Sequence, residues 1–130
     1  MVAGASQPPV RKLFTLVSGW GNGTSTIVGY PKKLSSPWAA LVNGACAHVL
    51  DYDDNFDPAK AHASAVLVPA LLAVGEEESV SLGALLDAYI VGLQAMGHIG
   101  QAVNPFHRSS VPTPSRFTLA SRPPAACNPR

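Results

Sequence analysis

The residues of this chain whose types and spacing could support chemistry are concentrated in residues 43–64. This stretch contains four carboxylates and two imidazoles, which belong to Asp51, Asp53, Asp54, Asp57, His48 and His62. Only 13% of the chain is charged, and ionisable side chains are costly to gather unless they are solvated, paired or used in a site. Because the stretch lies between two apolar segments, metal binding and acid–base catalysis are the chemistries to consider.

Metal binding is the first possibility for this stretch. Alternating oxygen ligands, as at the start of a calcium-binding loop, are present at Asp51, Asp53, Asn55 and Asp57. The agreement then ends, because Phe56 stands where that loop requires glycine and His62 where it requires a bidentate glutamate. A transition-metal site formed by His48, Asp51 and His62 is an alternative that no spacing enforces. The sequence therefore predicts no dedicated metal site.

Acid–base catalysis is the second possibility. An imidazole such as that of His62 titrates near neutral pH, and a nearby carboxylate can fix its tautomer. Asp51 follows the end of a predicted helix, where its charge opposes the helix macrodipole, which indicates some other use for the group. Because His62 lies at the start of the next apolar segment, the two side chains would converge if the loop between them folds back.

An architectural interpretation is also open. Asp53, Asp54 and Asp57 are residues that cap helices and form turns, so they could simply connect two helices. His48 continues a helical apolar pattern and is predicted to be a packing residue, and Lys60 is predicted to be a solvated loop lysine. Residue types alone do not decide between this interpretation and a functional site.

The spacing of apolar residues predicts three helices that would position the loop. The first begins at Ser36–Pro37, a cap followed by a residue suited to the first turn, and runs to about Leu50. The second covers Ser64–Val74. The third starts after a Ser81 cap and ends at Asn104–Pro105. Three helices form an all-α sub-domain rather than a complete bundle, so we expect apolar faces without partners.

The two ends of the chain differ from this helical region. Residues 1–10 are small, polar and proline-bearing, and are predicted to be a flexible N-terminus. Residues 11–18 fit a helix or a strand equally well. Residues 109–130 are rich in proline, serine and arginine and lack a hydrophobic period, so they are predicted to be a disordered tail.

Composition limits the remaining possibilities. A chain of 130 residues that is 47% apolar fits one globular domain, and a net charge of +1 gives no basic surface for nucleic acid. Two cysteines, Cys46 and Cys127, are too few for a disulfide framework. The sequence shows neither a signal-peptide core nor an uninterrupted apolar run of membrane-spanning length. We therefore expect a soluble, cytoplasmic protein without nucleic-acid or membrane partners.

At the acidic loop the chain resembles the MmgE/PrpD family, which includes 2-methylcitrate dehydratase and cis-aconitate decarboxylase. The resemblance covers residues 11–108 in one order, so it is far more specific than a short motif. The segments that carry it are Ala39–Asp54, His62–Ser64, Val68–Ala73, Leu85–Gly92 and Asn104–Pro105.

The resemblance implies a fold and an activity. It implies a large all-helical domain with a smaller α/β lid domain, assembled as a homodimer. It also implies lyase chemistry on small polycarboxylates, in propionate metabolism for 2-methylcitrate dehydratase, without a metal or an organic cofactor. By the same resemblance Asp51 and His62 are the catalytic pair, with His62 as the general acid/base and Asp51 as the group that orients it.

The resemblance also has limits. Family members run to several hundred residues, and the family pattern is lost at Arg108, before a segment that supplies another active-site histidine. Residues 11–108 therefore look like a fragment of the family's helical domain that lacks much of the active site. The favoured reading is a 2-methylcitrate dehydratase-like hydro-lyase that is inactive as this fragment. The alternatives are a cis-aconitate decarboxylase-like or epimerase-like protein, a non-enzymatic remnant, or a helical metal-binding module.

Overall fold

A computed structural model describes residues 1–110 of the chain, with side chains described for residues 1–103. Most of the stretch predicted as a disordered tail therefore lies outside the described residues. The elements, in chain order, are η1 (Val2–Gly4), α1 (Pro8–Val17), β1 (Ser25–Thr26), β2 (Lys33–Leu34), α2 (Ser36–His48), α3 (Ala63–Glu78) and α4 (Leu82–Ser110). The prediction of an all-α fold is confirmed, with one small antiparallel hairpin in which Ser25 pairs with Leu34.

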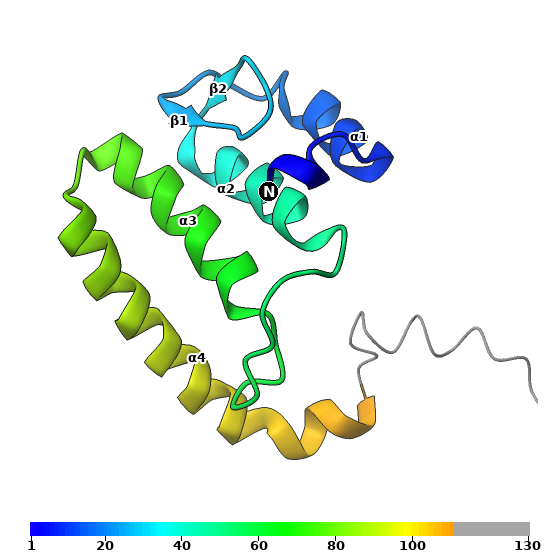
Figure 1. Ribbon diagram of the computed structural model, residues 1–130, viewed down its shortest axis with the longest axis vertical. Helices are drawn as coiled ribbons and strands as arrows, with labels where there is room; N and C mark the ends of the chain where they lie inside the picture. The colour runs from blue at the N-terminus through cyan, green and yellow to red at the C-terminus, as the bar shows by residue number, and fades with distance from the viewer. Residues whose placement is uncertain (111–130) are drawn as a thin grey trace, which may run out of the picture.

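The three long helices form one layer (Figure 1). α3 lies between α2 and α4, α1 and η1 lie on the side of α2 away from α4, and the β1–β2 hairpin lies near the start of α2, where β1 also contacts α3. The core sits between α2 and these N-terminal elements, because the buried apolar residues come mainly from them: Val10, Val17, Ile27, Leu34, Ala39, Val42, Cys46 and Ala73. Cys46 is buried and forms no disulfide within the described residues, and it packs as a small core residue.

Asn43 ties the hairpin region to α2. Its side chain is 2% exposed, its Oδ1 accepts a hydrogen bond from the Val28 N–H (2.9 Å), and its Nδ2 donates to the Thr26 carbonyl (2.9 Å). Ser25 lies in β1, and its Oγ donates a hydrogen bond to the Ala73 carbonyl of α3 at 2.7 Å. These bonds hold α2 and α3 in a fixed relation, because a buried polar group is stable only when it has a partner.

The N-terminal residues differ from the prediction that residues 1–10 are flexible. Gly4, Ala5 and Val10 are buried, and α1 already begins at Pro8. A Cβ added at Gly4 would overlap the carbonyl of Cys46 and lie 2.9 Å from Val49 Cγ1, so η1 packs directly on α2. At Gly4 a side chain would not fit, because the backbone of α2 passes close by.

The helices α3 and α4 run further than predicted. α3 continues through Gly75 to Glu78, and Ser79 takes the left-handed conformation (φ 54°) that commonly follows the end of a helix. Gly75 instead allows close packing, since a Cβ there would lie 2.7 Å from Leu85 Cδ2. α4 continues through Pro105 to Ser110, since a proline removes one helical hydrogen bond but keeps a helical φ. The Ser81 cap is confirmed, with the Ala84 N–H donating to Ser81 Oγ at 3.2 Å.

One face of α4 carries the apolar surface that was expected to lack partners. Leu85, Tyr89, Leu93 and Met96 are half-buried, whereas other large apolar residues of the helix are exposed: Leu82, Leu86, Ile90, Val91, Ile99 and Val103. By length and composition alone, Leu82–Val103 is also long and apolar enough to cross a membrane. The packing of α4 along α3 accounts for one side of this helix, and the exposed side remains available for further contacts.

Candidate functional site

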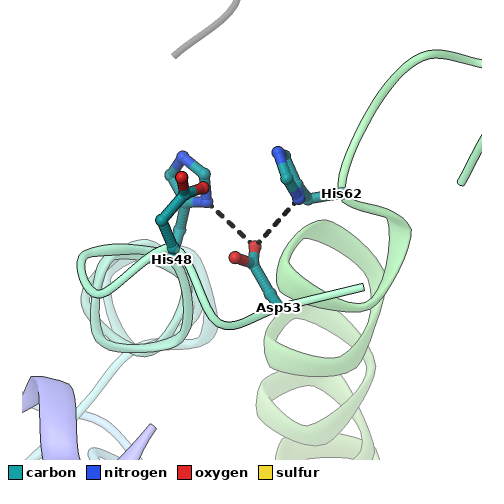
Figure 2. Close-up of side chains that lie close together, drawn as sticks. His48, Asp53 and His62 are labelled. Carbon is teal, nitrogen blue, oxygen red and sulfur yellow. Dashed lines mark hydrogen bonds and ion pairs between the residues drawn. The ribbon is translucent and has the colours of Figure 1, made fainter. Parts of the chain in front are cut away.

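The candidate site lies where α2 ends and α3 begins. His48 is the last residue of α2, and His62 is the N-cap residue of α3. The loop between the helices carries Asp53 into the space between the two imidazoles, as Figure 2 shows. The loop therefore folds back on itself, and this is the arrangement in which the ionisable side chains at its two ends were expected to converge.

Both imidazoles face one carboxylate oxygen. His48 Nδ1 lies 2.9 Å from Asp53 Oδ2, and His62 Nδ1 lies 3.6 Å from the same atom. The ring centroids of His48 and His62 are 4.8 Å apart. The Asp53 side chain is only 7% exposed, and its other oxygen, Oδ1, is buried without a hydrogen-bond partner among the described residues. Asp53 is thus a nearly buried carboxylate shared by two histidines.

The hydrogen bond of His62 to the backbone fixes its tautomer. His62 Nδ1 lies 2.9 Å from the carbonyl oxygen of Asp54. A carbonyl oxygen only accepts hydrogen bonds, so Nδ1 carries the proton and Nε2 keeps its lone pair. In Figure 2 the second ring nitrogens of His48 and His62 both point away from Asp53, toward the same side of the site. The lone pair of His62 Nε2 therefore faces away from the buried Asp53 carboxylate.

Asp51 joins this cluster from the turn that ends α2. Its N–H donates to the His48 carbonyl at 2.8 Å, and its backbone is left-handed (φ 55°), which is uncommon for a residue with a side chain. One ligand atom from each of His48, Asp51, Asp53 and His62 lies within 4.8 Å of the others. The structure thus brings the two predicted site residues, Asp51 and His62, into one cluster. Their catalytic roles stay predictions.

The predicted catalytic pair leaves out two members of the cluster, of which His48 appears as a site residue only in the metal-binding alternative. Asp53 was assigned to loop architecture and His48 to packing, whereas the structure places both at its centre. The available signal was the position of His48 at the end of a predicted helix with a carboxylate five residues later. That spacing alone could not reveal the contact, because the path of the loop decides which carboxylate turns inward.

The interpretation of the acidic residues as helix caps is confirmed for Asp54. Asp54 Oδ1 accepts a hydrogen bond from the Ser64 N–H (2.9 Å) and so caps the first turn of α3. Lys60 forms an ion pair with Asp57, and a backbone bridge between Phe56 and Ala61 closes the loop. These contacts make the loop a supporting frame for the cluster.

The helix α4 braces this frame from the side. Phe56 packs near Gly97, and a Cβ added at Gly100 would lie 2.7 Å from Ala59 Cβ. Ser64 Oγ and Tyr89 Oη form a hydrogen bond of 2.9 Å between α3 and α4. The site therefore depends on three helices, since α2 and α3 carry its imidazoles and α4 supports its loop.

A cavity of about 350 Å³ opens beside the cluster, between η1, the end of α2 and the start of α3. Asp53 and Asp54 belong to its wall, which is otherwise mostly apolar and includes Cys46, Leu50 and Val68. Burial raises the pKa of the Cys46 thiol, so this side chain is not a ready nucleophile. The charged side chains of the wall are carboxylates, and Met1, whose amino group acts electrostatically on the Cys46 thiol, also belongs to the wall.

The cluster as a whole is poor in cations. Among the described side chains, no lysine or arginine nitrogen lies within 4.0 Å of the carboxylates of Asp51, Asp53 or Asp54. Lys60, the nearest lysine in the sequence, pairs with Asp57. The described part of the site can therefore transfer protons or bind a cation, whereas groups that hold an anion must come from elsewhere.

The chain matches one family model and three curated proteins. The sequence model of the MmgE/PrpD N-terminal domain matches residues 1–126. The chain is 34% identical to cis-aconitate decarboxylase of Mus musculus over 101 residues, which cover 74% of this chain and 20% of that protein. It is 36% identical to cis-aconitate decarboxylase of Homo sapiens over 83 residues, covering 60% of this chain and 17% of that protein.

A fungal protein is similar to the same degree. The cis-aconitate decarboxylase-like protein oryM of Aspergillus oryzae is 31% identical over 88 residues, covering 62% of this chain and 18% of that protein. The chain thus spans about a fifth of the length of these curated relatives. No solved structure matches.

Proposed function

Because the chain belongs to the MmgE/PrpD family, we propose that its histidine–aspartate cluster is the acid–base part of a lyase site for a small polycarboxylate. The observation that carries the proposal is the hydrogen bond from His62 Nδ1 to the Asp54 carbonyl. It leaves the Nε2 lone pair of His62 free on the side away from Asp53. A base with a fixed tautomer and a free nitrogen is what proton transfer to or from carbon requires.

In this mechanism His62 is the group that moves the proton. In a decarboxylation, protonated Nε2 gives its proton to the carbon chain as the bond to the departing carboxylate breaks and carbon dioxide leaves. In a dehydration, neutral Nε2 removes a proton from a carbon next to a carboxylate, and the resulting imidazolium gives a proton to the hydroxyl group, which leaves as water. In both reactions Asp51 and Asp53 stabilise the imidazolium form through their negative charge.

We propose cis-aconitate as the substrate, because three similar proteins are named for that compound or as like such an enzyme. 2-Methylcitrate is the competing substrate that the sequence resemblance suggested. Either compound carries several carboxylates, and the described cluster offers them no partner cation. We therefore propose that cationic groups outside residues 1–103 bind the substrate carboxylates. We expect little turnover from residues 1–103 alone. A cytoplasmic homodimer is part of the same proposal.

A chimera tests the proposal directly. This chain would replace the aligned segment of the mouse cis-aconitate decarboxylase, so that the rest of that enzyme supplies whatever the chain does not span. We expect the chimera to decarboxylate cis-aconitate, and His62→Ala to lower kcat by about 10²- to 10⁴-fold, the usual contribution of a general acid or base. His98→Ala, at an exposed histidine of α4, is the matched control and should retain activity.

The outcomes separate the alternatives. A folded chimera that is active and indifferent to His62→Ala would refute the assigned role of this residue. A folded chimera that dehydrates 2-methylcitrate and leaves cis-aconitate unchanged would replace the proposed substrate. The same two substrates offered to the 130-residue chain alone measure how much of the activity the chain supports by itself.

A further inference from the structure

We propose that the cluster of His48, Asp51 and His62 also binds a divalent transition-metal ion, with Asp53 behind the two imidazoles as the group that orients them. The ion would bind to His62 Nε2, which is the atom that must be free for the proposed acid–base role. Metal binding would therefore block that role rather than serve it, and the site is an inhibitory one.

The first argument is the hydrogen bonding of the two imidazoles. A histidine that binds a metal through one nitrogen usually donates the other N–H to a carboxylate or a backbone carbonyl. His62 donates from Nδ1 to the Asp54 carbonyl, and His48 Nδ1 lies 2.9 Å from the carboxylate of Asp53. Both Nε2 atoms are then left as ligands, and both point to the same side of the cluster (Figure 2).

The second argument is the uncompensated charge. The Asp53 side chain is more than nine-tenths buried, and its Oδ1 has no hydrogen-bond partner among the described residues. A nearly buried carboxylate is unfavourable without positive charge nearby, and an ion bound by the two imidazoles would supply such charge from the other side of the rings. No described lysine or arginine supplies that charge, since the ion pairs of Asp53 are with His48 and His62.

The third argument is the fit of the ligands to a small ion. One possible ligand atom from each of His48, Asp51, Asp53 and His62 lies within 4.8 Å of the others, and ligands of a tetrahedral zinc ion, bound at about 2.0 Å, lie about 3.3 Å apart. Asp51 is exposed, so its side chain is free to turn toward an ion held by the two imidazoles. Two imidazoles and a carboxylate suit zinc and its neighbours, whereas calcium and magnesium prefer oxygen ligands alone.

Calorimetric titration of the 130-residue chain with zinc chloride tests the inference. We expect one zinc ion per chain near neutral pH, with weaker binding on acidification because protons compete for the imidazoles. Removal of an outer partner usually weakens metal binding about 10- to 100-fold. We therefore expect at least about a tenfold loss of affinity for His48→Ala, and a similar loss for Asp53→Asn.

Matched variants locate the ion. His98→Ala removes an exposed histidine of α4, and Cys127→Ser removes a thiol outside the described residues; neither should change zinc affinity. Zinc should also shift the ring resonances of His48 and His62 and leave those of His98 in place. His48→Gln, with its helical circular dichroism recorded, shows whether a loss of binding reflects a lost ligand or a lost fold.

Two results would overturn the inference. One is the absence of both heat and imidazole shifts on adding zinc to the folded chain. The other is binding that survives His48→Ala and disappears in Cys127→Ser or His98→Ala. Because the titration needs no turnover, it can succeed when the proposed lyase function fails, and it can fail when that function holds.

Discussion

Asn43→Ala is predicted to be one of the most destabilising single substitutions in the described part of the chain. The Asn43 amide is 2% exposed and bonds to two backbone groups at 2.9 Å, the Val28 N–H and the Thr26 carbonyl. The substitution would leave both groups without this partner. A buried polar group left unsatisfied costs about 1–3 kcal/mol, so the expected loss is roughly 2–6 kcal/mol before any relief by water.

This magnitude is large relative to the stability of a small domain, which is about 5–15 kcal/mol. Urea unfolding followed by circular dichroism measures it as a lower midpoint with an unchanged dependence on urea concentration. Asn22→Ala makes the same chemical change at an exposed asparagine and should shift the midpoint little. Asn43→Asp keeps an acceptor for the Val28 N–H but removes the donor and buries a charge, so it should also destabilise.

The reasoning would be refuted by a specific result. If Asn43→Ala unfolds at the same urea concentration as Asn22→Ala, the two hydrogen bonds do not hold the hairpin region to α2. The same would follow if Asn43→Asp were as stable as the unchanged chain. The helix that carries His48 would then be positioned by apolar packing alone.

Two further substitutions test other contacts of the fold. Gly100→Ala should destabilise the chain by about 1–3 kcal/mol in urea unfolding, because the new Cβ would lie 2.7 Å from Ala59 Cβ. Hydrogen bonds from the backbone N–H and the hydroxyl of Thr26 lower the pKa of Glu76. This carboxylate therefore stabilises the fold above its unfolded-state pKa and loses that contribution as the pH falls through its folded-state pKa. Glu76→Gln should be less stable near neutral pH, and the difference from the unchanged chain should narrow on acidification.

Each of these substitutions has its own control. Gly19→Ala adds the same methyl group where nothing lies within 4 Å, so it should not reproduce the effect of Gly100→Ala. Glu77→Gln removes a neighbouring exposed carboxylate. A difference that persists unchanged at low pH for Glu76→Gln, or that appears equally for Glu77→Gln, would contradict the assigned role of the Thr26 contact.

Much of the helical framework could be predicted from local sequence. Pro37 near the start of α2, the Ser81 cap of α4 and the apolar spacing between them are local signals, because a helix needs only its own backbone and its end residues. The errors lie where a distant segment changes the meaning of a small residue. Gly4 lies in a segment predicted to be flexible, and Gly75 lies just beyond the predicted end of the second helix, but both are sites where another element or its side chains approach closely.

The sequence by itself determined that carboxylates and imidazoles gather in residues 43–64 between two helices, and that the chain resembles one family. Those conclusions depend on residue types and order, which the chain carries without folding. Only the tertiary structure decided that Asp53, rather than Asp51, is the carboxylate shared by His48 and His62, and that the Asp54 carbonyl fixes the tautomer of His62. The physical reason is that these contacts depend on how the loop turns between α2 and α3, and α4 packs against that loop from far along the chain.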